Sequence, residues 1–243
     1  MQAELDQQWA RLVSNDPDIV LPTLSEAFED NDAPAAPIGV QGDEVSIVVL
    51  VPNEEAVPEQ LPATTQAGNL TLRKLPKGER SVFYGRLIAG HVLVTLREGF
   101  AVAPGINSAR LIAVRTTVPD IYGRSSLECM LAGHWSRAAF NGVQWQDADS
   151  GKILVGTATE LISNEKRGQM VPIDLAAEPE ISEVLSGIDT ADLSVERLLT
   201  DGSRCGRTCL GLWSWRIAAG QCPIDRDFIP NVPRPPLAAT SLG

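Results

Sequence analysis

The sequence lacks the short motifs that identify several common enzyme classes. The glycine-rich loops GxGxxG and Walker A, the zinc motif HExxH and the nucleophile motif GxSxG do not occur in its 243 residues. Histidine is also scarce, with two residues in the whole chain. These absences lower the expectation of nucleotide-binding folds, zinc proteases and serine hydrolases, but they do not exclude enzymes in general.

Long apolar runs and disulfide frameworks are missing as well. The most apolar stretches, residues 45–51 and 87–96, are far shorter than the ~20 residues that cross a bilayer. The first six residues include two acidic ones, where a signal peptide requires basic residues. Four cysteines are too few for a disulfide scaffold. We therefore expect a cytoplasmic protein with no membrane partner.

Positive charge is in short supply. The formal net charge is -11, with 31 acidic residues against 20 lysines and arginines. Such a surface repels the phosphate backbone of DNA and RNA, so we expect no general nucleic-acid binding. Hydrophobic residues make up 44% of the chain, which is enough for a sizeable core.

The hydrophobic periodicity predicts an α+β fold. Residues 1–32 are expected to form a helical segment, with Leu5, Trp9 and Leu12 on one face and a second helix that begins at Pro17 or Pro22. Residues 33–190 are expected to form the main domain. Its sheet would be antiparallel, with hairpins at 38–51 and 110–132 and a strand at 69–75 after a polar connection at 52–68. Helices at 76–102, from Asp149 through Ile162, and at 179–186 would cover one face of this sheet.

The C-terminal segment, residues 191–243, differs in composition. From residue 201 onward it contains five arginines, five prolines and three of the four cysteines, but no lysine or glutamate. A disordered extension and a shifted reading frame explain this composition equally well. A zinc site at Cys205, Cys209 and Cys222 is less favoured, because structural zinc needs four ligands. We therefore predict no metal and no cofactor.

Two groups of polar side chains are candidates for a functional site. The first is a stripe on the long helix, formed by Arg80, Tyr84, His91 and Glu98, in which His91 and Glu98 are candidate acid–base residues. A solvated or interface face of the helix explains the same stripe. The second is a basic cluster that could bind an anion, or that could only protect an edge strand from pairing: Arg73, Lys74, Lys77, Arg80 and Arg86.

Acidic and aromatic residues give weaker signals. Asp43 and Glu44 fit a hairpin turn, and Asp147 and Asp149 fit a helix start, so a divalent metal bound by these residues or by Glu160 is the minority interpretation. Trp135 and Trp145 are expected in the core, although one of them could line a pocket.

Three segments carry a resemblance to a known group of sequences. Residues 67–76 (AGNLTLRKLP), 97–106 (REGFAVAPGI) and 174–181 (DLAAEPEI) resemble segments of conserved hypothetical proteins from GC-rich bacteria. The resemblance covers roughly residues 10–189. It implies a bacterial, intracellular protein and transfers no catalytic residue.

Taken together, these patterns favour a non-enzymatic protein-interaction or regulatory domain with a protein partner. The alternative is an enzyme that acts on a phosphate-containing substrate through the basic cluster with His91 and Glu98. The oligomeric state cannot be inferred from the sequence.

Overall fold

The computed structural model describes residues 2–66, 68–122, 125–146 and 149–186. The chain begins with α1 (Gln2–Val13) and α2 (Pro17–Phe28). The remaining elements, in chain order, are β1 (Ala35–Gln41), β2 (Glu44–Leu50), η1 (Glu54–Ala56), β3 (Gln60–Thr64), β4 (Leu70–Lys74), α3 (Lys77–Val102), β5 (Ser108–Thr116), β6 (Leu127–Ser136), η2 (Arg137–Phe140), α4 (Ser150–Thr157), β7 (Ala158–Lys166), β8 (Gln169–Val171) and α5 (Pro179–Ser186).

The fold is α+β, as the sequence predicts. Its main sheet has the strand order β1-β2-β5-β6-β7-β8, and its pairs are antiparallel except for β2 and β5. The two predicted hairpins, β1–β2 and β5–β6, are therefore joined by a parallel pair, which the expectation of an antiparallel sheet missed. The intervening helix α3 explains the pairing, because parallel strands need a long crossover connection.

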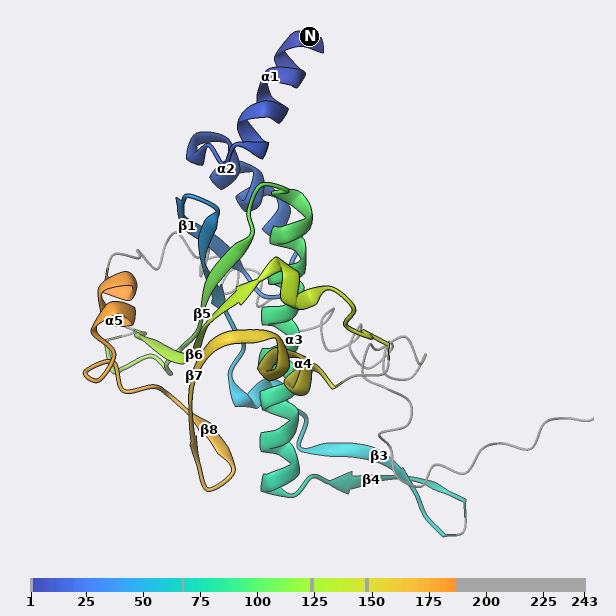
Figure 1. The fold of residues 1–243 in the computed structure, drawn as a ribbon. Coiled ribbons are helices and arrows are strands. Elements are labelled where there is room, and N and C mark those ends of the chain that lie inside the picture. Colours follow the sequence, from blue (N-terminus) through green and yellow to red (C-terminus); the bar gives the residue numbers. More distant parts are fainter. Residues whose placement is uncertain (1, 67, 123–124, 147–148, 187–243) are drawn as a thin grey trace, which may run out of the picture.

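The predicted strand at 69–75 is present as β4 but does not join the main sheet. It pairs with β3 to form a separate two-stranded sheet that projects from the body of the protein (Figure 1). Residues 52–68 were expected to be a polar connection, so β3 was missed. Its Pro62 and polar neighbours weaken the strand signal, and the side chains of β4 are all exposed.

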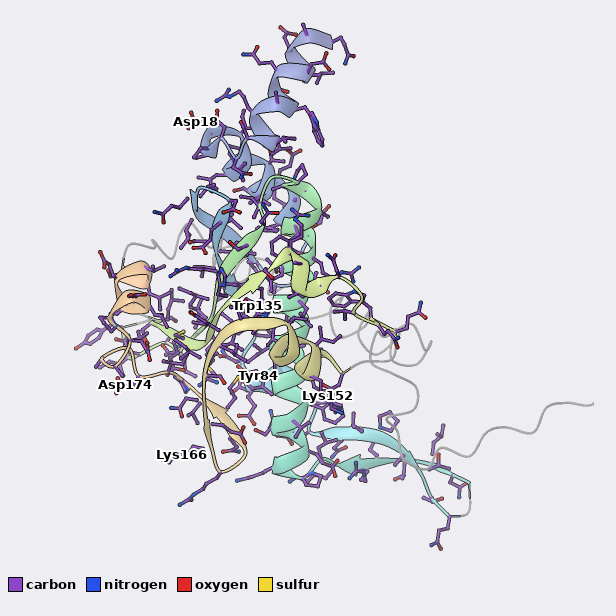
Figure 2. All side chains as sticks on the ribbon, viewed as in Figure 1. Asp18, Tyr84, Trp135, Lys152, Lys166 and Asp174 are labelled. Carbon is purple, nitrogen blue, oxygen red and sulfur yellow. The ribbon has the colours of Figure 1, made fainter. Side chains whose placement is uncertain are left out.

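Helices cover both faces of the main sheet, so the prediction of one covered face is wrong. On the first face α2, α3 and α4 pack against the sheet around Leu24, Ile88, Leu111 and Trp135, all fully buried. Tyr84 and Trp135 both lie in this central layer (Figure 2). On the second face Ile181 of α5 packs with the side chains of Val48, Leu50, Ile112 and Val114.

One helix boundary differs from the prediction. The helix after Asp149 ends at Thr157, and residues through Ile162 belong to β7, because pairing with β6 outweighs the helical spacing of Leu154, Leu161 and Ile162. The second helix begins at Pro17, one of its two predicted starts, and contains Pro22 in its interior. Helix α5 also has the predicted bounds.

Some expectations concern segments outside the described residues. These are the interpretations of residues 191–243, including the cysteine site at Cys205, Cys209 and Cys222, and the role of Asp147. Within the described ranges, no helix combines the length and the apolar character that crossing a membrane requires.

Candidate functional site

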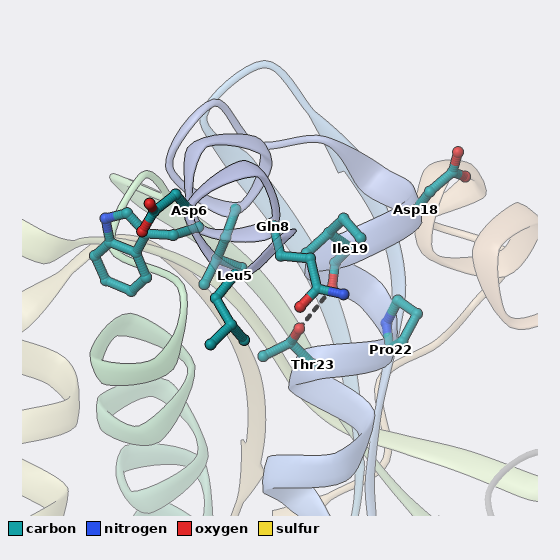
Figure 3. A pocket seen from close by; sticks show the side chains of 9 residues that line it. Leu5, Asp6, Gln8, Asp18, Ile19, Pro22 and Thr23 are labelled. Atoms are coloured by element: carbon teal, nitrogen blue, oxygen red, sulfur yellow. Dashed lines mark hydrogen bonds between the residues drawn. The ribbon is translucent and has the colours of Figure 1, made fainter. Parts of the chain in front are cut away.

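A hollow lies between the first two helices. This N-terminal groove has a volume of about 530 Å³. Figure 3 shows Asp6 and Asp18 on opposite sides of it, with Thr23 between them on α2. The groove is lined by Leu5, Asp6, Gln8, Trp9 and Leu12 of α1 and by Asp18, Ile19, Pro22 and Thr23 of α2.

The turn between α1 and α2 fixes the groove. Asn15 has a positive φ of 60°, and its side-chain amide donates to the carbonyl of Gly105 at 3.0 Å. Asp16 caps α2 by accepting from the backbone N–H of Asp18, and it also binds the Arg11 guanidinium at 2.6 Å. These contacts hold the C-terminal end of α1 against the start of α2.

Among the described residues, no element covers most of α1. Leu12 is its single buried residue, whereas Leu5, Trp9 and Val13 are 54%, 60% and 45% exposed. In Figure 1 the helix projects beyond the rest of the fold. The expected face of Leu5, Trp9 and Leu12 therefore exists, but two of its three apolar side chains face the groove and the solvent instead of the core.

Negative charge surrounds these apolar side chains. Residues 2–30 contain seven acidic residues and one basic residue, Arg11. Arg11 binds Asp16 and lies 3.8 Å from Asp18. The hydrogen bond from Arg11 lowers the pKa of the Asp16 carboxyl below its usual value. Asp6 and Asp18 line the groove itself, so its walls combine apolar and acidic groups.

The predicted stripe on α3 faces neighbouring segments of the chain. The Tyr84 hydroxyl donates to the carbonyl of Pro52, and Arg80 donates to the carbonyl of Glu54. Glu98 accepts from the side-chain amide of Asn31 at 2.6 Å. His91 is half-buried, and it lies seven residues, or about 10 Å along the helix, from Glu98. The stripe thus ties α3 to the segments that flank the first hairpin, and the structure does not bring His91 and Glu98 together.

The side chains of the basic cluster do not converge on one site. Arg73 pairs with Glu79, Arg80 reaches the carbonyl of Glu54, and Arg86 pairs with Asp149 at the start of α4. Lys74 and Lys77 are exposed. The three arginines therefore make contacts with three separate segments, and neither the N-terminal groove nor the smaller hollow beside β7 and β8 is lined by any of the five residues.

A cluster of three polar side chains that no sequence pattern predicts lies on the second face of the main sheet. Glu44 of β2 accepts from Arg110 of β5 at 2.8 Å and contacts Nε2 of His134 of β6 at 3.0 Å. Asp43 also has a protein partner, because its carboxylate accepts a hydrogen bond from the side-chain amide of Asn107. Both acidic residues of the turn therefore contact protein groups. Throughout the described ranges, no three His, Cys, Asp or Glu side chains are placed to hold a metal ion.

The two tryptophans differ in environment. Trp135 is fully buried, as predicted, and its indole N–H donates to the carbonyl of Leu154. Trp145 is partly buried, stacks on Phe140 and lies under the Arg97 guanidinium at 4.3 Å. Both side chains serve packing.

Comparison with known proteins adds no family to these observations. No protein-family model, no curated protein and no solved structure matches the chain. The candidate site is therefore defined by its geometry and chemistry alone.

Proposed function

We propose that this protein is a protein-interaction domain that receives an apolar segment of a partner in the N-terminal groove. The observation that carries the proposal is the exposed apolar face of α1, with Leu5 and Trp9 more than half exposed at the rim of a groove. Exposed apolar side chains that adjoin a groove are a feature of binding sites, and tryptophan is among the residues enriched at binding hot spots.

Other exposed apolar side chains support the proposal less. Leu70 and Leu72 lie on the β3–β4 arm, and Val118, Ile121 and Tyr122 lie in the β5–β6 loop. None of them lines the groove or the smaller hollow.

The alternative is an enzyme in which the basic cluster, His91 and Glu98 act on a phosphate-containing substrate. This hypothesis has less support, because these side chains contact separate segments of the chain.

The test uses fluorescein-labelled amphipathic helical peptides with one leucine stripe, measured by fluorescence anisotropy against the full-length protein. We expect saturable binding that Trp9→Ala weakens about tenfold or more, because hot-spot truncations cost at least ~1.4 kcal/mol. Leu70→Ala is the matched control, since Leu70 is 86% exposed and lies on the β3–β4 arm. Absence of binding, or equal binding by the Trp9→Ala variant, would contradict the proposal.

A further inference from the structure

We infer that the partner segment is a basic amphipathic helix, whose apolar face contacts Leu5 and Trp9 while its lysines or arginines face Asp6 and Asp18. This inference rests on the proposed function and specifies the chemistry of the partner. It combines the shape of the groove with its net negative charge.

The shape favours a helix. The groove runs between two helices, α1 and α2, and each has 12 residues, which corresponds to about 18 Å. Helix-in-groove recognition places apolar anchors at i, i+3, i+4 and i+7 between two such walls. Three turns of a partner helix match the length of α1.

The charge favours lysine and arginine. Asp6 lies on one side of the groove and Asp18 on the other (Figure 3), and Asp18 has an 88% exposed side chain. Among the described residues that line the groove there is no lysine, arginine or histidine, and Arg11, 3.8 Å from Asp18, already binds Asp16. The N-terminus of α2 supplies a partial positive charge of roughly half an elementary charge, which Asp16 and Asp18 outweigh.

Pro22 removes one backbone hydrogen-bond donor from the α2 wall of the groove. A proline has no backbone N–H, so the carbonyl of Asp18, four residues earlier in α2, lacks its usual intrahelical donor. Both Asp18 and Pro22 line the groove. A lysine or arginine of the partner helix supplies the hydrogen-bond donors that an acidic helix lacks.

The same charges disfavour a second copy of this chain as the occupant. Pairing two α1–α2 faces would place Asp6 and Asp18 of each copy against another acidic surface, and like charges repel within about one Debye length, ~10 Å at 0.1 M salt. A basic partner removes this repulsion and gains attraction instead. A neutral apolar helix gains the hydrophobic contact alone.

The experiment compares three helical peptides that share one leucine stripe and carry lysine, glutamine or glutamate on the polar face. At low salt, about 50 mM, we expect the lysine peptide to bind the full-length protein at least tenfold more tightly than the glutamine peptide, and the glutamate peptide most weakly. At about 500 mM salt this preference should shrink several-fold, because screening acts on exposed charges.

Two double variants test whether the preference for the lysine peptide comes from the acidic residues of the groove. Asp6→Asn with Asp18→Asn should remove most of the preference for lysine, whereas the matched control Glu55→Gln with Glu165→Gln, two exposed acids outside the groove, should retain it. Circular dichroism verifies that each variant is folded. If the wild type binds all three peptides with equal affinity and the Trp9→Ala variant binds none of them, the inference is overturned and the proposed function stands. A wild-type dimer that Trp9→Ala dissociates in sedimentation experiments would also overturn it, since the occupant would then be a second copy.

Discussion

The guanidinium of Arg137 donates a hydrogen bond to the backbone carbonyl of Phe100 at 2.6 Å and lies over the Phe100 ring, 5.1 Å from its centre. The same guanidinium donates to the carbonyls of Ala103 and Ile106 at 2.6 to 2.8 Å. The last carbonyls of a helix have no intrahelical donor. One side chain that follows β6 therefore satisfies the C-terminal end of α3 and fixes it against the sheet.

Replacing Arg137 by methionine should destabilise the fold by about 2–4 kcal/mol, because several carbonyls lose charged hydrogen-bond donors. Arg137→Lys should recover only part of this loss, since an ammonium cannot reproduce the planar fork. Urea unfolding measures both. The control is Arg110→Met: Arg110 is 61% exposed and pairs with Glu44, so its loss should cost less than about 1 kcal/mol. Equal costs at the two positions would contradict the structural role of Arg137.

Gly133 and Gly90 should respond in opposite directions to alanine. A Cβ at Gly133 would lie 2.5 Å from the Trp135 ring and 2.8 Å from the carbonyl oxygen of Glu160, so Gly133→Ala should destabilise the protein by roughly 1–3 kcal/mol. A Cβ at Gly90, inside α3, meets no atom within 4 Å. Gly90→Ala should therefore stabilise by about 0.5–1 kcal/mol through helix propensity. Thermal unfolding of the two variants beside the wild type is the measurement, and a stabilised Gly133→Ala protein would show that β6 and β7 do not approach as described.

Elements with a strong local signal could be predicted from the sequence. The helix that begins at Pro179 and the long helix after Pro76 have apolar spacing and a proline at the start, and the structure contains both. The parallel pairing of β2 with β5 and the strand β7 depend on tertiary contacts, which no local pattern encodes.

The candidate site shows a second limit of sequence patterns. The spacing of Leu5, Trp9 and Leu12 predicts an apolar helix face, but it does not indicate whether the protein's own core or another molecule covers that face. The contact of Glu44 with His134 joins residues 90 positions apart, and it depends on the register of three strands. A period or a motif cannot supply that register.

Cys129 should be unreactive in the folded protein. Its side chain is fully buried, and burial raises the pKa of the thiol to about 11. Because the thiolate is the reactive form, iodoacetamide at about pH 8 should not label Cys129 until the protein unfolds. Mass spectrometry of the peptide that contains Cys129 measures this, with the same protein in denaturant as the positive control. Rapid labelling under native conditions would mean that β6 opens locally.

His91 should make the protein less stable as the pH falls below neutrality. Burial lowers the pKa of its imidazole below the ordinary value of 6.5, and the nearby Asp32 opposes this shift only in part. The folded pKa therefore lies below the unfolded one, so the unfolded chain takes up a proton first. The stability associated with the neutral imidazole is fully present above pH 6.5 and is lost as the pH falls through the folded pKa.

The variant His91→Gln keeps a polar side chain that cannot titrate, so its free energy of unfolding should fall less steeply than that of the wild type just below pH 6.5. Urea unfolding at pH values from about 8 to about 5 separates this effect from that of carboxylates, whose ordinary pKa values lie near 4. If the two proteins lose stability in parallel over this interval, the loss comes from groups other than His91.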